Sequence, residues 1–302
     1  MTAVARRRPP ALPLLIWLTV SVVGWAMVAW LAVRGFSVSP PTVGFDLELV
    51  LQAGRDVAAG GSPYDPALLG GAAPEAVGLF FSYPPIVAQA FAPFAGIPAG
   101  VMFLGWSALA ITALFIVAER IRKSLAANVL AGATGLGAVA AGALTFPFVV
   151  AILFGNLDAV FPALYGLALI GAVSSRATDR ALGGVAVGLA ALAKLYPAAL
   201  GIWFAVRALR ERGGGARRTL LATVVAGAAL LLASLLVGGV GPWQDYARVV
   251  AAAGQADLID SRNVAPAAQI ALLIGAGSDT ARLIHLPIAL AAVLVTVWAA
   301  WA

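Results

Sequence analysis

Asp46 is a carboxylate in a setting that favours chemistry. It lies near the start of residues 44–57, which carry apolar side chains on one side and several charges on the other, a pattern typical of a helix at a membrane surface. A carboxylate there can face a lipid head group and act as a base. Asp is also a good helix cap, and the local sequence by itself favours this purely structural role.

Lys194 interrupts an apolar stretch, residues 182–208, at the sequence Lys-Leu-Tyr-Pro. Proline disfavours a continuous helix there, so the stretch predicts a hairpin of two short apolar arms with Lys194 at its tip. An ammonium between such arms is costly to place and indicates function. It can hold a lipid phosphate as a point charge. The alternative is that the side chain extends, or snorkels, to a nearby membrane interface.

Arg248 and Arg262 are further candidates for binding a phosphate. Both belong to residues 241–283, a polar stretch that we expect on the same side of the membrane as Asp46. We expect them to support Lys194 with additional positive charge.

Three turns between the apolar stretches supply candidate substrate contacts. A Gly- and Pro-rich turn at 60–66 contains a tyrosine, Tyr-Pro-Pro occupies 83–85, and Gly-Asn-Leu-Asp occupies 155–158. The last two also have simpler explanations, because proline suits the first turn of a helix and Gly-Asn is typical of a polar turn between helices. The candidate substrate-binding residues are Tyr64, Tyr83, Asn156, Asp158 and Tyr196.

The composition places these residues in a membrane protein. Of 302 residues, 62% are hydrophobic and only 11% are charged, whereas charged residues make up about a quarter of a soluble domain. These values exclude a disordered chain, a nucleic-acid-binding domain and an ordinary cytosolic enzyme. The chain has no cysteine and one histidine, so it offers no disulfide, no thiolate site and little for a zinc site. We expect no metal and no cofactor.

Apolar runs of about 20 residues predict the membrane helices. With the two arms of 182–208 they give an all-α polytopic bundle of about eight membrane segments, in one domain that spans 1–302. The first polar segment, 34–78, carries the surface helix with Asp46, and the second is 241–283. The clear apolar runs are 12–33, 98–118, 128–147, 157–173, 219–240 and 284–302.

Basic residues indicate the orientation. Most of the 19 Lys and Arg fall in four short segments, which the positive-inside rule places in the cytosol. The N-terminus is then cytosolic, and Asp46 and Lys194 face outward at the plasma membrane. Residues 79–96 cannot cross in this arrangement, so we expect them to lie along or dip into the outer leaflet. The basic segments are Arg6–Arg8, Arg120–Lys123, Arg176–Arg180 and Arg207–Arg218.

Taken in chain order, these residues resemble the GT-C polytopic glycosyltransferases. The closest resemblance is to family 87, the polyprenyl-phosphate-mannose-dependent α-1,2-mannosyltransferase type, and it extends over about residues 12–275. The motifs that carry it are Asp46, Gly-Ser-Pro-Tyr at 61–64, Tyr-Pro-Pro at 83–85, Gly-Asn-x-Asp at 155–158 and Gly-Leu-Ala-x-x-x-Lys-x-x-Pro at 188–197.

The resemblance implies an inverting transfer at the outer membrane face. A hexose, with mannose expected, leaves a polyprenyl phosphate, and a hydroxyl of a glycolipid or glycan acceptor attacks it within the setting of the lipid bilayer. In such enzymes the acid of the first outer loop serves as general base, a role that maps onto Asp46. The family is described as needing no nucleotide sugar, and we expect no nucleic acid as a partner.

Two departures from the family and two other functions stay open. Family members are usually longer, so we expect a truncated or divergent member. Residues 255–270 lack the Asn- and Ser-rich pattern expected there, which leaves acceptor recognition open.

A transporter of lipid or small solute would show inverted repeats and discontinuous helices that face a midplane site. The interruption at 182–208 fits a transporter weakly, but no paired interruption is visible. A non-catalytic scaffold would leave Lys194 unexplained.

Overall fold

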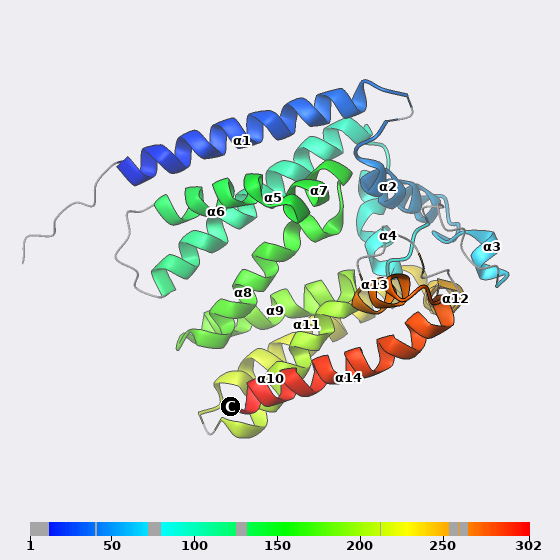
Figure 1. The fold of residues 1–302 in the computed structure, drawn as a ribbon. Helices are drawn as coiled ribbons and strands as arrows, with labels where there is room; N and C mark the ends of the chain where they lie inside the picture. Colours follow the sequence, from blue (N-terminus) through cyan, green and yellow to red (C-terminus); the bar gives the residue numbers. More distant parts are fainter. Residues whose placement is uncertain are drawn as a thin grey trace, which may run out of the picture.

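The computed structural model describes residues 12–39, 41–71, 80–124, 132–211, 213–253, 259 and 265–302. All regular structure in these ranges is helical, as the sequence predicts. Figure 1 shows long helices that run across the molecule, with a group of short helices gathered at one end. The described fold is therefore a helix bundle with short helices over one end.

Four helices of the described residues are long and apolar enough to cross a membrane. Many of the exposed side chains on these helices are large and hydrophobic, as contact with lipid favours. The prediction of about eight membrane segments is not confirmed, because the other apolar helices are shorter or bent. The four long helices are α1 (Leu12–Phe36), α5 (Ala99–Ser124), α11 (Gly215–Gly238) and α14 (Ser278–Trp301).

The predicted span 128–147 is corrected to a bent pair of helices. α6 (Ala133–Leu144) and α7 (Phe146–Phe154) meet at 79°, and counted together they make a fifth span at most. Thr145 between them has an extended backbone (φ −97°, ψ 108°), and Pro147 in the first turn of α7 has no N–H to continue the first helix. The chain therefore turns here instead of continuing in one straight helix.

Three shorter helices follow and position Lys194. The hairpin predicted at 182–208 is interrupted where the sequence indicated, because the Lys194 backbone is extended (φ −146°, ψ 141°) and ends one helix. The helices are α8 (Phe161–Val173), α9 (Ala177–Ala193) and α10 (Ala199–Arg210), with the 3-10 turns η2 (Leu157–Val160) and η3 (Tyr196–Ala198) before α8 and α10.

Glycines let α9 pack closely against two neighbours. A Cβ atom on Gly183 would lie 2.7 Å from the Cα of Gly171 in α8, and one on Gly184 would lie 2.2 Å from the carbonyl oxygen of Thr219 in α11. Small residues of this kind allow the backbones of membrane helices to approach each other. α9 is therefore held between α8 and α11, which fixes the position of Lys194 at its end.

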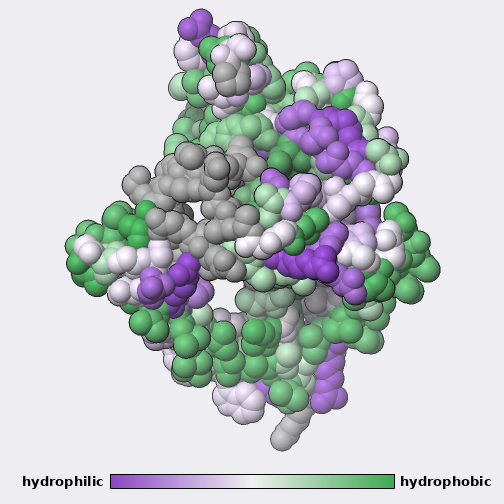
Figure 2. Space-filling model, turned by 90° about the vertical axis from the view of Figure 1, so that its right-hand side faces the viewer, coloured by the Kyte–Doolittle hydropathy of each residue, from purple (hydrophilic) through white to green (hydrophobic). Residues whose placement is uncertain are grey.

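One end of the bundle, here called the polar end, is built from short helices. Its first helix buries Leu47, Val50 and Leu51 and exposes Glu48 and Gln52, so the amphipathic helix predicted for 44–57 is confirmed as a helix. Figure 2 looks onto this end and shows hydrophilic residues gathered on it, with hydrophobic residues along the sides. The helices of the polar end are α2 (Phe45–Ala58), α3 (Pro66–Leu69), α4 (Pro85–Phe91), α12 (Gly241–Ala253) and α13 (Pro266–Leu273).

In the described part of the predicted segment 79–96, the helices are too short to cross a membrane. This part consists of α4, with seven residues, followed by the 3-10 turn η1 (Ala92–Phe94). α4 packs against α2, α11 and α12 at the polar end. This placement agrees with the expectation that the segment does not span.

Three of the four basic segments meet at the opposite end, here called the basic end (Figure 1). Arg120 Nη2 donates to Asp179 Oδ1 at 2.6 Å, which joins the end of α5 to the start of α9. The guanidinium of Arg180 packs against Gly215 at the start of α11. The segment Arg6–Arg8 lies outside the described residues. The basic segments and the short polar helices therefore occupy opposite ends, which is the segregation that the positive-inside rule requires.

Candidate active site

Four side chains from three distant parts of the chain form one connected group where the bundle meets the polar end. Asn156 Nδ2 donates to Asp46 Oδ2 at 2.7 Å, and Lys194 Nζ donates to Asn156 Oδ1 at 3.2 Å. Lys194 Nζ also lies 2.9 Å from Asp158 Oδ1. We call Asp46, Asn156, Asp158 and Lys194 the Asp46–Lys194 cluster. The structure thus brings together the two charges that the sequence singled out.

Asp46 does not cap its helix. The N-cap of α2 is Gly44, whose backbone is left-handed (φ 73°), and no side chain caps this end. The Gly44 N–H donates to the carbonyl oxygen of Leu153 at 2.8 Å and ties the start of α2 to the end of α7. The Asp46 carboxylate instead accepts a hydrogen bond from Asn156, so the capping alternative is wrong.

Asn156 lies in a tight turn that faces the start of α2. Gly155 ends α7 with a left-handed backbone (φ 69°), and a Cβ atom there would lie 2.5 Å from the Cβ of Leu47. Asn156 Oδ1 accepts from the backbone N–H of Asp158 at 2.8 Å, and the Asn156 carbonyl oxygen accepts from Trp106 Nε1 at 3.1 Å. The segment is therefore the polar turn that the sequence allowed, and the same turn presents two members of the cluster.

The Lys194 ammonium is held inside the cluster. Its side chain is 20% exposed, and Nζ lies 5.3 Å from the ring centre of Tyr83, within the range of a cation–π contact. Asp158 and Asn156 take two of the three ammonium protons in the described contacts, which leaves one for a ligand. A snorkelling ammonium would have its head in water, whereas this one contacts Asp158, Asn156 and Tyr83.

The three candidate tyrosines have different positions. Tyr83 packs under the Lys194 ammonium, and the Tyr196 hydroxyl donates to Asp158 Oδ1 at 3.2 Å, so both border the cluster. The Tyr64 hydroxyl donates to the carbonyl oxygen of Tyr83 at 3.0 Å. Tyr64 is buried among aromatic rings, so it supports Tyr83. The prediction that Tyr64 contacts a substrate does not fit this burial.

Of the two arginines predicted to help Lys194, the structure describes Arg248, and no described contact joins it to Lys194. Arg248 lies on α12 with 62% of its side chain exposed, and its described contact is an ion pair with Asp245 (Nη1···Oδ1 3.2 Å). Arg262 lies outside the described residues. In the described residues, Lys194 is therefore the cation that supplies positive charge to the cluster.

Burial raises the pKa of Asp46 above its ordinary value, because the carboxylate loses water. The hydrogen bond from Asn156 and the charge of Lys194 favour the ionised form and partly offset this effect, whereas Asp158 adds to it. Burial also raises the pKa of Tyr83, and the negative charge of Asp46 contributes. A carboxylate with a raised pKa is a stronger base than one in water.

Two hollows adjoin the cluster. One, of about 310 Å³, has Tyr83, Lys194 and Tyr196 in its wall. The other, of about 410 Å³, has Asn156 and Asp158 in its wall. One hollow therefore borders the ammonium of the cluster, and the other borders its amide.

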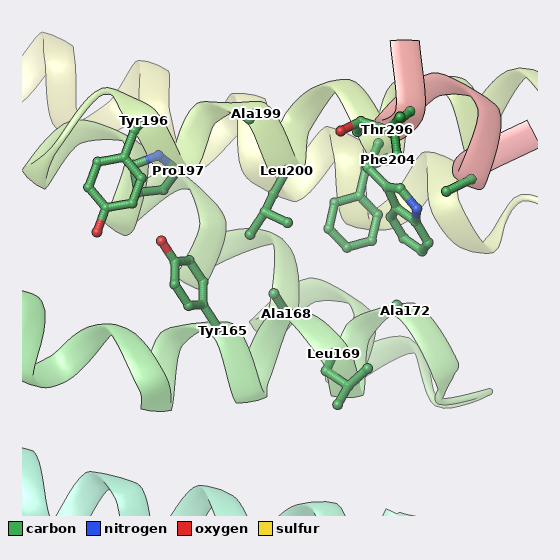
Figure 3. Close-up of a pocket in the computed structure, with 13 residues that line it drawn as sticks. Tyr165, Ala168, Leu169, Ala172, Tyr196, Pro197, Ala199, Leu200, Phe204 and Thr296 are labelled. Carbon is green, nitrogen blue, oxygen red and sulfur yellow. The ribbon is translucent and has the colours of Figure 1, made fainter. Parts of the chain in front are cut away.

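An apolar groove of about 550 Å³ lies between α8, α10 and α14, and we call it the α8–α10 groove. Figure 3 shows Tyr165 and Tyr196 at one end of it, with Leu200 and Phe204 further along. Because Tyr196 also lines the hollow around Lys194, the groove adjoins that hollow. A larger apolar groove, of about 850 Å³ between α1 and α5, has no cluster residue in its wall.

Sequence reasoning missed Tyr165 and Trp106. Tyr165 follows Asp158 by about two helical turns, so both lie toward the same side of this helical segment, and the spacing was a usable signal. Trp106 lies in the apolar helix α5 and bonds to the backbone of Asn156. No local pattern distinguishes such a tryptophan from one that faces lipid.

Comparison with known proteins gives one family. The family model for glycosyltransferase family 87 matches residues 80–302, which is more than half of the chain and includes Asn156, Asp158 and Lys194 but not Asp46. No curated protein and no solved structure matches. The family match confirms the resemblance seen in the sequence and favours a transferase over a transporter. The chain therefore belongs to glycosyltransferase family 87 and is a membrane glycosyltransferase.

Proposed function

We propose that the protein transfers a hexose, mannose by resemblance, from a polyprenyl phosphate to a hydroxyl group of a glycolipid or glycan. The reaction takes place at the outer face of the plasma membrane and inverts the anomeric configuration. The observation that carries this proposal is that a half-buried carboxylate, Asp46, and an ammonium, Lys194, bond to opposite ends of one amide, Asn156. Inverting transfer needs a base and a means of stabilising the leaving phosphate, and these two charges supply them.

Asp46 is the general base. Its Oδ2 accepts from Asn156, which leaves Oδ1 to take the proton of the acceptor hydroxyl. The hydroxyl oxygen attacks the anomeric carbon from the face opposite the phosphate, and the new C–O bond forms as the bond to the phosphate oxygen breaks. One carboxylate is enough, because a phosphate leaves without a protein acid.

Lys194 stabilises the leaving phosphate. The electron pair of the broken bond stays on the phosphate oxygen, so negative charge builds there. A fixed ammonium meets this charge, and its effect is larger where water is excluded. Asp158 and Asn156 already hold the ammonium, so little reorganisation is needed when the donor binds.

The α8–α10 groove supports a polyprenyl donor. Its walls are mostly apolar side chains, and at Tyr196 it meets the hollow around Lys194 (Figure 3). A lipid phosphate has the matching form, with a charged head joined to a long apolar chain. A donor with its phosphate at Lys194 can therefore lay its chain in the groove.

Transfer by the purified protein tests this proposal. The protein is reconstituted in lipid nanodiscs and incubated with labelled polyprenyl-phosphate mannose and a membrane-lipid extract. We expect a labelled product with the wild type, and no product when a labelled nucleotide sugar replaces the polyprenyl donor. Product formed from the nucleotide sugar alone would contradict the proposed donor. A labelled glucose donor, tested in parallel, determines whether mannose is preferred.

A further inference from the structure

The side-chain amide of Asn156 occupies a special position in the cluster. Among the described residues it alone bonds to both Asp46 and Lys194: Nδ2 donates to the carboxylate at 2.7 Å, and Oδ1 accepts from the ammonium at 3.2 Å. A residue that only shapes a turn needs neither of these bonds. The amide therefore links the two charges in addition to forming the turn.

The orientation of this amide is determined by its neighbours. Oδ1 accepts from two donors, the backbone N–H of Asp158 and the Lys194 ammonium, while Nδ2 faces a carboxylate, which only accepts. A flipped amide would place its NH2 group against two donors and its oxygen against the Asp46 carboxylate. Three attractive contacts would become repulsive, so one orientation is strongly favoured.

The backbone of Asn156 is held as firmly as its side chain. The Asn156 N–H donates to the carbonyl oxygen of Ala151 at 2.8 Å, and Trp106 Nε1 donates to the Asn156 carbonyl oxygen at 3.1 Å. The turn is also pressed against the start of α2, where Gly155 contacts Leu47. A firmly held amide can in turn hold a flexible carboxylate.

We propose that Asn156 is a positioning residue, which fixes the distance and orientation between the Asp46 carboxylate and the Lys194 ammonium. Nδ2 binds Oδ2 of Asp46 and turns Oδ1 toward the acceptor hydroxyl, while Oδ1 of Asn156 keeps the ammonium on the far side of the amide. This inference rests on the proposed function, because it assigns Asn156 a role in the same transfer reaction.

The proposal predicts a change in pH dependence, since Asp46 acts in its ionised form. The charged or titratable groups that face Asp46 are Lys194, Asp158 and Tyr83. On α2 itself, Glu48 is paired with Arg55. The neighbouring helices α4 and α7 contain no titratable side chain, and the acidic and basic residues of α5 lie at the basic end. The donation from Asn156 is therefore a main support of the ionised carboxylate.

The variant Asn156→Ser separates the two roles of this residue. Serine caps a helical turn about as well as asparagine, so the bond to the N–H of Asp158 has a replacement, but the short hydroxyl does not reach Asp46. We expect the acid limb of the transfer rate to move up by about one pH unit, the size expected when a carboxylate loses one charge-assisted hydrogen bond. The matched control is Asp65→Ser, because Asp65 caps α3 through the N–H of Ala67, away from the cluster.

An infrared titration measures the same effect without transfer. The band of the protonated Asp46 carboxyl is obtained as the difference between each protein and its Asp46→Asn counterpart, in nanodiscs, over a range of pH. We expect its midpoint to rise in Asn156→Ser and to stay unchanged in Asp65→Ser. A lower rate at every pH with an unmoved acid limb and an unmoved infrared midpoint would show that Asn156 is only structural. Absence of transfer in the wild type would overturn the proposed function, while the infrared midpoints would still decide the role of Asn156.

Discussion

Replacing Lys194 with methionine removes the ammonium but keeps the length and apolar bulk of the side chain. A donor aimed at developing negative charge contributes about 2.7–4 kcal/mol to a transition state. Lys194 is 20% exposed and shares its charge with Asp158, so we expect a smaller effect, of at least about 1.4 kcal/mol, which is a tenfold loss of turnover. The Lys194–Asp158 pair is partly exposed and contributes only about 0–1 kcal/mol to folding. Turnover should therefore fall without loss of the folded protein.

Initial transfer rates at saturating acceptor, measured across donor concentration and pH, test this prediction. Lys194 favours the ionised form of Asp46, so its removal raises the pKa of that carboxyl further. When the pH is lowered, the variant should therefore lose activity at a higher pH than the wild type does. Lys123→Met is the matched control, because Lys123 is exposed at the basic end. Equal turnover in Lys194→Met and wild type would refute the assignment of the phosphate to Lys194.

Three further predictions concern topology, the groove and packing. Cysteine introduced at Ser62 should react with an impermeant thiol reagent in intact cells, whereas cysteine at Thr178 should not, and labelling of the latter would overturn the orientation; the absence of native cysteine makes the scan clean. Leu200→Trp fills the α8–α10 groove and should raise the KM of a long-chain donor more than that of a short-chain analogue. Equal changes in the two KM values would show that the donor chain does not bind in the groove. Gly183→Ala should cost about 1–3 kcal/mol by overpacking against α8, measured as a lower thermal midpoint, while Gly201→Ala, which has open space, should be neutral or stabilising.

The helical class and the two central charges were predictable from the sequence because each depends on local composition. Long apolar runs predict membrane helices, and a charge such as Lys194 within them is conspicuous. The number of spans was not predictable, because α9 and α10 are apolar but short and the chain bends at Thr145. A proline shows that a helix is weakened and does not show by how much the chain turns.

The assembly of the cluster was beyond local reasoning. Asp46 and Lys194 are far apart in the chain, and they meet because α9 packs on α8 and α11 through glycines and because the Gly155 turn fits against α2. Arg248 has a charged partner on its own helix. Asp245 precedes it by three residues on a helix, a spacing at which opposite charges pair, so the sequence already offered this arginine a partner.

In the proposed mechanism Asp46 takes the proton of the acceptor, and transfer by the Asp46→Asn variant tests this role. Gly44 caps α2, so the substitution removes no cap, and an amide of the same shape can remain beside Asn156. The matched control is Asp56→Asn, because Asp56 lies on the same helix and bonds to Gln52. We expect Asp46→Asn to fold normally, to bind the lipid donor as the wild type does, and to lose transfer by about 10²-fold or more, in line with general-base contributions. Near-normal transfer by the purified variant would show that Asp46 is not the base.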